Sequence, residues 1–341
     1  MKKILLTGVA GFIGYHLFQR LRNENFEIVS LDNLNNYYDI NLKLSRLAKA
    51  GFNVKKIACG RMIEANGGGR FIQLDLDDSA AISDLFHNEK FDAVCHLAAQ
   101  AGVRFSIENP ALYVKSNING FINILEECRK NHIKNLLFAS SSSVYGNTQH
   151  LPFSENDPLC SPASIYAATK LNNEIMAACY REFYGLRPIG LRFFTVYGPW
   201  GRPDMAIFKF TDAILNGHPI DVYNFGNMQR DFTYIDDIVE GITRIIKKVL
   251  TDNRFCARNI YNIGNGQPVG LMDFIRIIEK TTGKKAILNL LPLQPGDVYQ
   301  TWADTENLQN DFGFKPETSL KKGVENFVSW YMQFYNKNQV F

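Results

Sequence analysis

The feature that most constrains the fold is the alternation of short apolar runs with helix-like segments through the first half of the 341-residue chain. Strands that alternate with helices form a parallel sheet, because right-handed helical crossovers connect successive strands. Runs such as Ala93–Leu97 show no alternation of polar and apolar residues, which is typical of strands covered by helices on both faces. The pattern therefore predicts an α/β fold with a doubly wound parallel sheet.

The expected elements can be placed by residue range. The predicted strands are Lys3–Thr7, Glu27–Leu31, Arg70–Gln73, Ala93–Leu97, Asn135–Ser140 and Pro188–Phe193. The predicted helices between them are Phe12–Asn23, Ser79–Asn88, Ala111–Lys130 and Ala167–Tyr184. The segment Asn33–Gly69 is far longer than an ordinary loop. Within it, Ile40–Lys49 predicts a helix and Gly67–Gly69 a flexible turn.

Beyond Phe194 the pattern loosens, and prolines and glycines become frequent. We expect a smaller, mixed α/β second domain there, with the helix Ile235–Val249 and the strand Asn259–Ile263 returning to the first sheet. The predicted first domain is 1–194 together with about 231–265, and the second is 195–230 with 266–341.

Composition excludes several classes of protein. Hydrophobic residues make up 46% of the chain and charged residues 21%, as in globular proteins. A net charge of +3 does not favour a nucleic-acid partner, and no window approaches the roughly 18 to 20 apolar residues of a membrane span. The cysteines have no metal-ligand spacing and predict free thiols in a reducing compartment, so we expect a cytoplasmic protein without a metal. These cysteines are Cys59, Cys95, Cys128, Cys160, Cys179 and Cys256.

A glycine-rich turn follows the first predicted strand. Gly8, Gly11 and Gly14 lie in Thr7-Gly8-Val9-Ala10-Gly11-Phe12-Ile13-Gly14, which opens a predicted helix. Glycines let the backbone approach a pyrophosphate, and the helix N-terminus supplies N–H donors. The spacing differs from the usual G-x-G-x-x-G, but the position between a strand and a helix supports a dinucleotide site of Rossmann type.

Residues at the ends of later strands predict which dinucleotide binds. Asp32 lies 18 residues after Gly14, where a carboxylate can accept hydrogen bonds from both ribose hydroxyls of NAD and repel the 2′-phosphate of NADP. Asp75 could reach the adenine amine or could instead cap the helix near Ser79. The Leu97-Ala98-Ala99 segment is small enough to let the cofactor cross the sheet edge.

Tyr166 and Lys170 are four residues apart on a predicted helix and share one face. A lysine ammonium and a nicotinamide ring would lower the pKa of the phenol, so that Tyr166 could take a proton from a substrate hydroxyl while hydride leaves the same carbon. The run Ser140–Ser143 follows the fifth strand, at the carboxyl edge where ligands bind in such sheets.

Together these motifs resemble the extended short-chain dehydrogenases/reductases, in their nucleotide-sugar epimerase/dehydratase branch. Arg230-Asp231-Phe232 and Pro295-Gly296-Asp297 follow in the family's order, and the resemblance covers essentially the whole chain. It implies that Ser141, Tyr166 and Lys170 are catalytic and that Asn117 anchors the active-site helix and the cofactor. The predicted NAD site comprises Gly8, Gly11, Phe12, Ile13, Gly14, Asp32, Asn33, Asn35, Asn36, Asp75, Leu76, Leu97, Ala98, Ala99, Asn117, Tyr166, Lys170 and Phe194.

Within this branch, residues 32–39, 99–107 and 192–205 look most similar to UDP-glucuronate 4-epimerases. Independently, Arg202 could pair in bidentate fashion with the carboxylate of a uronic acid, with Thr195 as a further donor and Arg104 as a second candidate. We hypothesise transient oxidation at C4, rotation of the 4-keto sugar and reduction from the other face, with Arg230 on the diphosphate and Asp297 on the uridine ribose.

The predicted substrate residues are gathered around a local cationic site formed by Arg104, Arg202 and Arg230. Gln294 stands where many relatives have an arginine on the diphosphate. The complete set is Arg104, Ser141, Ser142, Ser143, Thr195, Arg202, Met205, Arg230, Gln294 and Asp297.

Other activities remain as alternatives. Related dehydratases and decarboxylases carry an acid beside the catalytic hydroxyl, whereas Ser142-Ser143-Val144 contains none. Thr301 is small and leaves open UDP-N-acetylglucosamine or its uronic acid as the substrate. A noncatalytic NAD-binding sensor usually lacks the tyrosine or the lysine, both of which are present here. The family also implies a homodimer through the helices near Ala111–Lys130 and Ala167–Tyr184.

Overall fold

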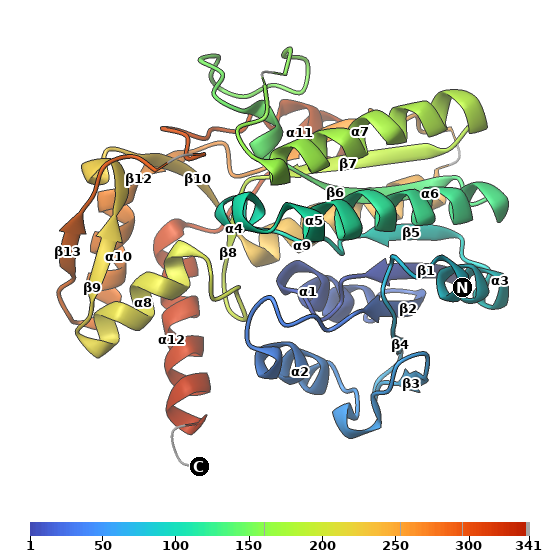
Figure 1. Cartoon of the computed structure of the whole chain (residues 1–341), viewed down its shortest axis with the longest axis horizontal. Coiled ribbons are helices and arrows are strands. Elements are labelled where there is room, and N and C mark those ends of the chain that lie inside the picture. Colours follow the sequence, from blue (N-terminus) through green and yellow to red (C-terminus); the bar gives the residue numbers. More distant parts are fainter. Residues whose placement is uncertain (160, 253, 295, 339–341) are drawn as a thin grey trace.

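The central feature of the computed structural model is an eight-stranded sheet (Figure 1), and the model describes residues 1–159, 161–252, 254–294 and 296–338. Cys160 and Pro295, both named above, lie outside the described residues. The strand order is β11-β7-β6-β5-β1-β2-β4-β3, and only the β3–β4 pair is antiparallel. The strands are β1 (Lys2–Thr7), β2 (Phe26–Asp32), β3 (Met62–Glu64), β4 (Arg70–Gln73), β5 (Ala93–His96), β6 (Asn135–Ser141), β7 (Arg187–Phe193) and β11 (Ile260–Ile263).

Helices cover both faces of this sheet, as the non-alternating strands predicted. Ile4 and Leu6 of β1 belong to one apolar core, whereas Leu5 between them belongs to the core on the other face. The first core includes α1 (Phe12–Leu21), α9 (Ile235–Thr251) and α11 (Glu306–Phe312), and the second includes α3 (Ser79–Glu89), α6 (Gly120–Lys130) and α7 (Ile165–Tyr184). The doubly wound α/β prediction is therefore confirmed.

Two local predictions need correction. The expected helix Ala111–Lys130 is not uniform, because α5 (Pro110–Tyr113) leads through a π-helical turn, η2 (Val114–Asn119), into α6. The long insertion contains α2 (Ile40–Lys49) as predicted, but it also contains β3, which pairs antiparallel with β4. A three-residue strand has too few residues to show a period of two, so the sequence pattern missed it.

The rest of the chain forms a smaller group of elements, at the left of Figure 1. It contains a three-stranded sheet, β12-β10-β8, and a two-stranded sheet, β13-β9. The predicted boundary at about residue 231 falls inside β10, which pairs with β8 and β12 and not with the large sheet. We propose the predicted division, 1–194 with about 231–265 and 195–230 with 266–341, as the domain organisation, with β10 assigned to the smaller group. The elements are β8 (Thr195–Tyr197), α8 (Ala206–Asn216), β9 (Pro219–Val222), β10 (Gln229–Tyr234), β12 (Pro268–Gly270), α10 (Leu271–Thr282), β13 (Ile287–Leu290) and α12 (Leu320–Asn338).

Three expectations about absent features can be compared with the described part of the chain. No helix there has the length and apolar character to cross a membrane. No cluster of three or more His, Cys, Asp or Glu side chains among those residues could bind a metal ion. The cysteines described, Cys59, Cys95, Cys128, Cys179 and Cys256, are all free thiols.

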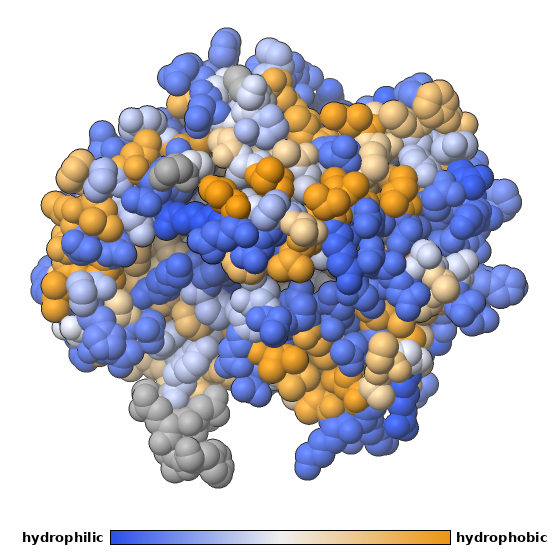
Figure 2. Space-filling model, in the orientation of Figure 1, coloured by the Kyte–Doolittle hydropathy of each residue, from blue (hydrophilic) through white to orange (hydrophobic). Residues whose placement is uncertain are grey.

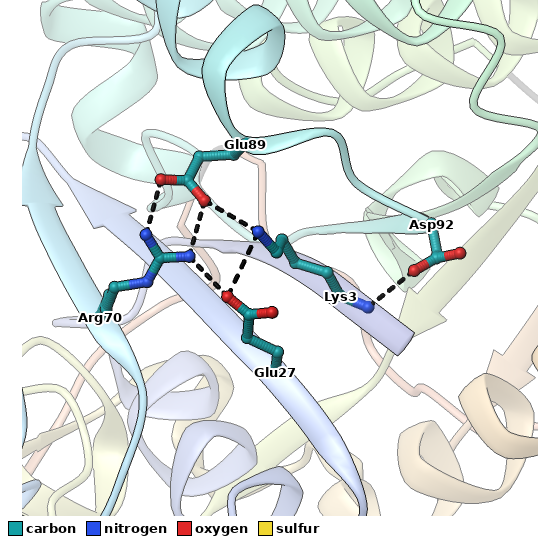
Figure 3. A network of polar contacts seen from close by, with 5 residues as sticks. All are labelled: Lys3, Glu27, Arg70, Glu89 and Asp92. Carbon is teal, nitrogen blue, oxygen red and sulfur yellow. Dashed lines mark hydrogen bonds and ion pairs between the residues drawn. The ribbon is translucent and has the colours of Figure 1, made fainter. Parts of the chain in front are cut away.

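A network of charged side chains joins the amino ends of three parallel strands (Figure 3). Arg70 on β4 makes a bidentate pair with Glu89 at 2.6 and 2.7 Å and contacts Glu27 on β2 at 2.6 Å. Lys3 on β1 contacts Glu89 and Glu27 at 3.2 and 3.3 Å, and its N–H donates to Asp92. The network thus ties β1, β2 and β4 to the end of α3, at the sheet edge opposite the glycine-rich turn.

A fully buried arginine connects the insertion to the glycine-rich turn and to the segment after β8. Arg46 on α2 is 0% exposed, and its guanidinium donates to the Ala10 carbonyl at 2.8 Å and to the Tyr38 hydroxyl. The same guanidinium donates to the carbonyls of Trp200, at 2.7 and 3.1 Å, and Gly201, at 3.2 Å. One side chain therefore holds three backbone segments together.

We expect Arg46→Met to lower the free energy of unfolding by about 2–4 kcal/mol, because three buried carbonyls lose their donor. Chemical denaturation would measure the loss. Arg22→Met is the matched control, since Arg22 donates to a single carbonyl, that of Ala50. Equal losses in the two variants would contradict the connecting role of Arg46.

Candidate active site

A cavity of about 980 Å³ opens at the carboxyl edge of the large sheet and extends to the elements that follow β7. It brings together almost all the predicted site residues, from both halves of the chain. Asn36, Asn117 and Gln294 are the predicted residues that do not line it. The predicted residues that line it are Gly8, Gly11, Phe12, Ile13, Gly14, Asp32, Asn33, Asn35, Asp75, Leu76, Leu97, Ala98, Ala99, Arg104, Ser141, Ser142, Ser143, Tyr166, Lys170, Phe194, Thr195, Arg202, Met205, Arg230 and Asp297.

The glycine-rich turn lies where the strand order reverses, between β1 and β5. Gly8 has φ +79°, and a Cβ there would come within 2.8 Å of the Ala98 backbone nitrogen. A Cβ on Gly14 would lie 2.1 Å from the Gly8 carbonyl oxygen, so the start of α1 packs directly on the turn. No side chain caps the N-terminus of α1. Its N–H groups are therefore available to an anion in the cavity.

The acidic residues beside this turn fit the adenosine end of a dinucleotide. Asp32 ends β2, and its carboxylate accepts hydrogen bonds from the backbone N–H groups of Ala10 at 3.1 Å and Leu34 at 2.9 Å. Each carboxylate oxygen keeps a lone pair for a ribose hydroxyl. Asp75 lines the cavity, and the alternative that it caps the next helix is wrong, because Asp78 caps α3.

Ser141, Tyr166 and Lys170 all line the cavity. Ser141 ends β6, and its hydroxyl contacts the Ser143 side chain at 3.1 Å. Tyr166 and Lys170 lie in the first turns of α7, whose N-cap is the Ser164 side chain. The Lys170 ammonium donates to the Ala139 carbonyl at 2.8 Å, which anchors α7 to β6.

Burial governs the protonation of this pair. Burial raises the pKa of Tyr166, and a hydrogen bond with Ser141 and the positive charge of Arg202 oppose that rise. Burial also lowers the pKa of Lys170 to about 7. Desolvation outweighs the neighbouring charges. The expected lowering of the phenol pKa depends on the nicotinamide ring as well as on the lysine, so it stays a prediction for the complex with NAD.

The first serine of the run has a structural role. Ser140 donates to the Glu174 carboxylate, which also makes a bidentate pair with Arg192 on β7 at 2.7 and 2.9 Å. Both partners of that ion pair are buried, with side chains 8% and 4% exposed. The Arg192 guanidinium stacks over the Tyr145 ring at 4.7 Å. This network fixes α7, and hence Tyr166, against the sheet.

Asn117 lies in the π-helical turn and connects two parts of the site without lining the cavity. Its side chain accepts from the Gln100 N–H at 2.8 Å and donates to the Gln100 carbonyl and the Thr169 hydroxyl, each at 3.0 Å. The Asn173 side chain donates to the Asn117 carbonyl at 2.7 Å. Asn117 thus ties the loop after β5 to α7, and its expected role in anchoring the active-site helix and the cofactor stays a prediction.

The expected cationic site is more nearly neutral than the sequence suggested. Arg104 forms an ion pair with Asp297 at 2.9 Å and stacks over a tyrosine ring at 4.3 Å. Arg202 is paired with Asp204. Arg230 donates to the backbone carbonyls of Gln229 and Tyr299, and burial lowers its pKa. Two of the three arginines thus have an acidic partner that charge counting along the chain could not locate.

Comparison with known proteins identifies the family to which this chain belongs. The model of the NAD dependent epimerase/dehydratase family matches residues 4–264 of this chain. The chain belongs to this family. Its relatives include Protein CapI of Staphylococcus aureus, 48% identical over 98% of this chain and 100% of that protein. A probable UDP-glucuronate 4-epimerase of Rhizobium meliloti is 43% identical over 98% of both proteins.

Solved structures agree with this membership. The crystal structure of UDP-glucuronic acid 4-epimerase from Bacillus cereus in complex with UDP-glucuronic acid and NAD superposes with a TM-score of 0.86. The two chains are 33% identical, and the alignment covers 98% of this chain and 100% of the other. Members of the family are NAD dependent, and the glycine turn, the uncapped α1 and Asp32 fit that cofactor.

Tyr37, Lys43 and Asp204 are among the polar residues that line the cavity but were not singled out from the sequence. Tyr37 and Lys43 come from the insertion after β2, and Asp204 follows Arg202 by two residues. Lys43 donates to both the carbonyl and the side chain of Asn35 at 2.6 Å. Tyr37 and Asp204 lie in the stretches that resemble UDP-glucuronate 4-epimerases, and Lys43 lies in the long insertion. Only the folded chain brings the three to one cavity with the predicted site residues.

The lowered pKa of Lys170 predicts a pH-dependent stability. Between about pH 7 and 10.5 the unfolded lysine binds a proton that the folded one has released, so the free energy of unfolding rises with pH in this window. Lys170→Met removes that dependence. We expect the variant to be more stable than wild type at pH 7, because wild type must bury the amine. The difference in the free energy of unfolding should shrink from pH 7 to pH 9.5, by at most about 1.4 kcal/mol per pH unit.

Chemical denaturation at several pH values would measure this difference. Lys134→Met is the control, because Lys134 is exposed and its replacement should leave the pH dependence of wild type unaltered. A stability difference between Lys170→Met and wild type that stays constant over the window would show that Lys170 titrates normally.

Proposed function

We propose that this protein interconverts UDP-glucuronate and UDP-galacturonate by NAD-dependent epimerisation at C4. The observation that carries the proposal is the position of Arg202. It lines the same cavity as Ser141, Tyr166 and Lys170, and its charge influences the pKa of Tyr166. A guanidinium there suits a substrate that has a carboxylate next to the reacting carbon. The Rhizobium relative and the Bacillus structure, both named for this activity, support the assignment.

The chain's own residues would hold the substrate and move its proton. Bound NAD supplies the chemistry of accepting a hydride from C4 and returning it. Tyr166 takes the proton of the C4 hydroxyl as the carbon is oxidised and gives it back when the carbonyl is reduced. Ser141 hydrogen-bonds the reacting oxygen, and Lys170 holds the nicotinamide ribose. Because every proton and hydride is returned, the reaction has no net redox change.

The remaining contacts would keep the nucleotide in place while the 4-keto sugar turns over in the pocket. Arg230, fixed by two backbone carbonyls, would bind the diphosphate. Asp297 would bind the uridine ribose, and its pair with Arg104 would orient it. Thr195 and Met205 lie on either side of the Arg202 segment and complete the sugar pocket.

Thr301 keeps N-acetylated UDP-sugars as a second candidate. It lines the cavity and is 8% exposed, and its hydroxyl accepts a hydrogen bond from the Asp231 N–H at 3.1 Å. Because the Thr301 side chain is small and its hydroxyl is bonded to the backbone, the cavity beside it has room for an N-acetyl group. Tyr166 and Lys170 are both present in the cavity, which favours an enzyme over a noncatalytic NAD-binding sensor.

Incubation with UDP-glucuronate, UDP-glucose and UDP-N-acetylglucosamine, followed by proton NMR at C4, tests the function. We expect inversion at C4 of UDP-glucuronate. Tyr166→Phe should lower its turnover by about 10²–10⁴-fold, because the proton acceptor is lost. NAD released on denaturation should be the same for both proteins. Full activity of Tyr166→Phe would refute the role of Tyr166, and an unchanged UDP-glucuronate spectrum with wild type would refute the proposed substrate.

We further propose a homodimer that works in the cytoplasm. Figure 2 shows apolar side chains gathered over α4 (Val103–Glu108), α5 and α7. Among them Ile107, Leu112, Ile175 and Phe183 are 46–75% exposed, which is typical of a surface that a partner covers. The face includes helices predicted to meet across a two-fold axis. The free thiols suit a reducing compartment.

The double variant Ile175→Glu with Phe183→Glu should convert the dimer to a monomer, because it places charges in the proposed apolar interface. Sedimentation velocity at micromolar concentration would measure the change. Ile287→Glu on β13 is the control, since Ile287 and Ile175 are both 55% exposed. A monomeric wild type, or equal dissociation of the control, would contradict the proposed interface.

A further inference from the structure

The insertion between β2 and β4 reaches into the substrate end of the cavity. Its Tyr37 hydroxyl donates to the Asp204 carboxylate at 3.2 Å, across 167 residues of sequence. Gly102, with φ +107°, makes room for this contact, because a Cβ there would lie 2.3 Å from the Tyr37 hydroxyl oxygen. The Tyr37 ring also packs against Phe105 with centroids 5.0 Å apart. The tyrosine is therefore held from two sides with its hydroxyl on Asp204.

Asp204 in turn occupies one edge of the Arg202 guanidinium. Its carboxylate accepts from Nε at 3.0 Å and also from Nη2. Asp204 thus engages Nε and one Nη2 proton, while the Tyr37 ring centroid lies 6.0 Å from the guanidinium carbon of Arg202. We take Nη1 and the second Nη2 proton as the donors for a ligand in the cavity. An arginine has five donors in a planar fork, and a second carboxylate can pair with the end that Asp204 leaves open.

Two carboxylates on one arginine repel each other unless the negative charge of the first is shared. The Asp204 oxygen that bonds Nη2, Oδ2, also accepts from the Tyr37 hydroxyl. This is the oxygen nearer the open end of Arg202. Tyr37 therefore withdraws charge from the side of Asp204 on which a second carboxylate would approach. Burial and the Asp204 charge raise the pKa of Tyr37 to about 12, so its proton stays in place at neutral pH.

The insertion also fixes the backbone that carries Arg202. Arg46 donates to the carbonyls of Trp200 and Gly201, immediately before it. Arg202 is thus oriented on its backbone side by Arg46 and on its side-chain edge by Asp204 and Tyr37.

We propose that Tyr37, acting through Asp204, is a positioning residue that sets the preference of this site for a sugar carboxylate over a neutral hydroxymethyl group. The inference rests on the proposed function, because it takes Arg202 to be the group that pairs with that carboxylate. Tyr37 touches neither substrate nor cofactor in this role. It determines which edge of Arg202 faces the ligand and how much negative charge lies beside it.

Binding titrations in the Tyr166→Phe background separate this role from catalysis. The dissociation constants of UDP-glucuronate and UDP-glucose are measured by calorimetry for that variant and for the same variant carrying Tyr37→Phe. We expect UDP-glucuronate to bind about tenfold more weakly after Tyr37→Phe, because one hydrogen bond to a charged group is lost. UDP-glucose should bind within about twofold of its original affinity. Tyr261→Phe is the matched control, since its hydroxyl contacts the Asp311 carboxylate at 2.6 Å outside the cavity.

A double-mutant cycle gives a second readout. Arg202→Leu should abolish the preference for UDP-glucuronate, and Tyr37→Phe should then have no further effect on the ratio of the two dissociation constants. A merely structural role of Tyr37 would instead change both ligands equally, or would add to the effect of Arg202→Leu, and either result would overturn the inference.

The NMR assay on wild type distinguishes the two levels of proposal. If wild type does not epimerise UDP-glucuronate, the proposed function fails. If wild type epimerises it and Tyr37→Phe leaves the ratio of dissociation constants unchanged, the function stands and the inference about Tyr37 is wrong.

Discussion

The site depends on the close approach of two strand ends at the centre of the sheet. Where the strand order reverses, Gly8 after β1 packs against the Ala98 backbone after β5, with no space for a side chain. This approach opens a crevice at the carboxyl edge, places the uncapped start of α1 in it and brings the loop after β5 beside it. Any larger residue at Gly8 or Gly14 would clash with backbone atoms.

Balanced charge is the second constraint on the cavity. Arg192 with Glu174, Arg202 with Asp204 and Arg104 with Asp297 are ion pairs around the proposed catalytic residues. The pairs have different roles: the first is buried and docks α7, whereas the other two line the cavity and leave arginine donors for a ligand. Such pairing lets arginines stand in a partly desolvated pocket without an uncompensated charge.

The insertion Asn33–Gly69 connects these two features. Its α2 directs Arg46 toward both the glycine-rich turn and the segment before Arg202, and its first residues supply Tyr37. The glycine-rich turn and Arg202, the proposed substrate arginine, are thus held by one stretch of chain. A change in either contact would alter the position of the carboxylate pocket relative to the reacting centre.

Several features could be predicted from the sequence because each depends on residues close together along the chain. They are the alternating α/β pattern, the glycine turn, Asp32, the serine run and the Tyr166–Lys170 pair. The strands of the large sheet other than β3 were predicted within one or two residues. The short strand β3, the π-helical turn around Asn117 and the individual strands of the smaller sheets were not predicted, because they show no clear local period. Other features could be seen only in the folded chain. Ser140 donates to Glu174, and Asp78 rather than Asp75 caps α3. Arg202 and Arg104 each form an ion pair with an aspartate. These are contacts, pairings and exposures set by packing between distant segments. Burial, likewise a property of the folded chain alone, raises the pKa of Tyr166 in the absence of a cofactor.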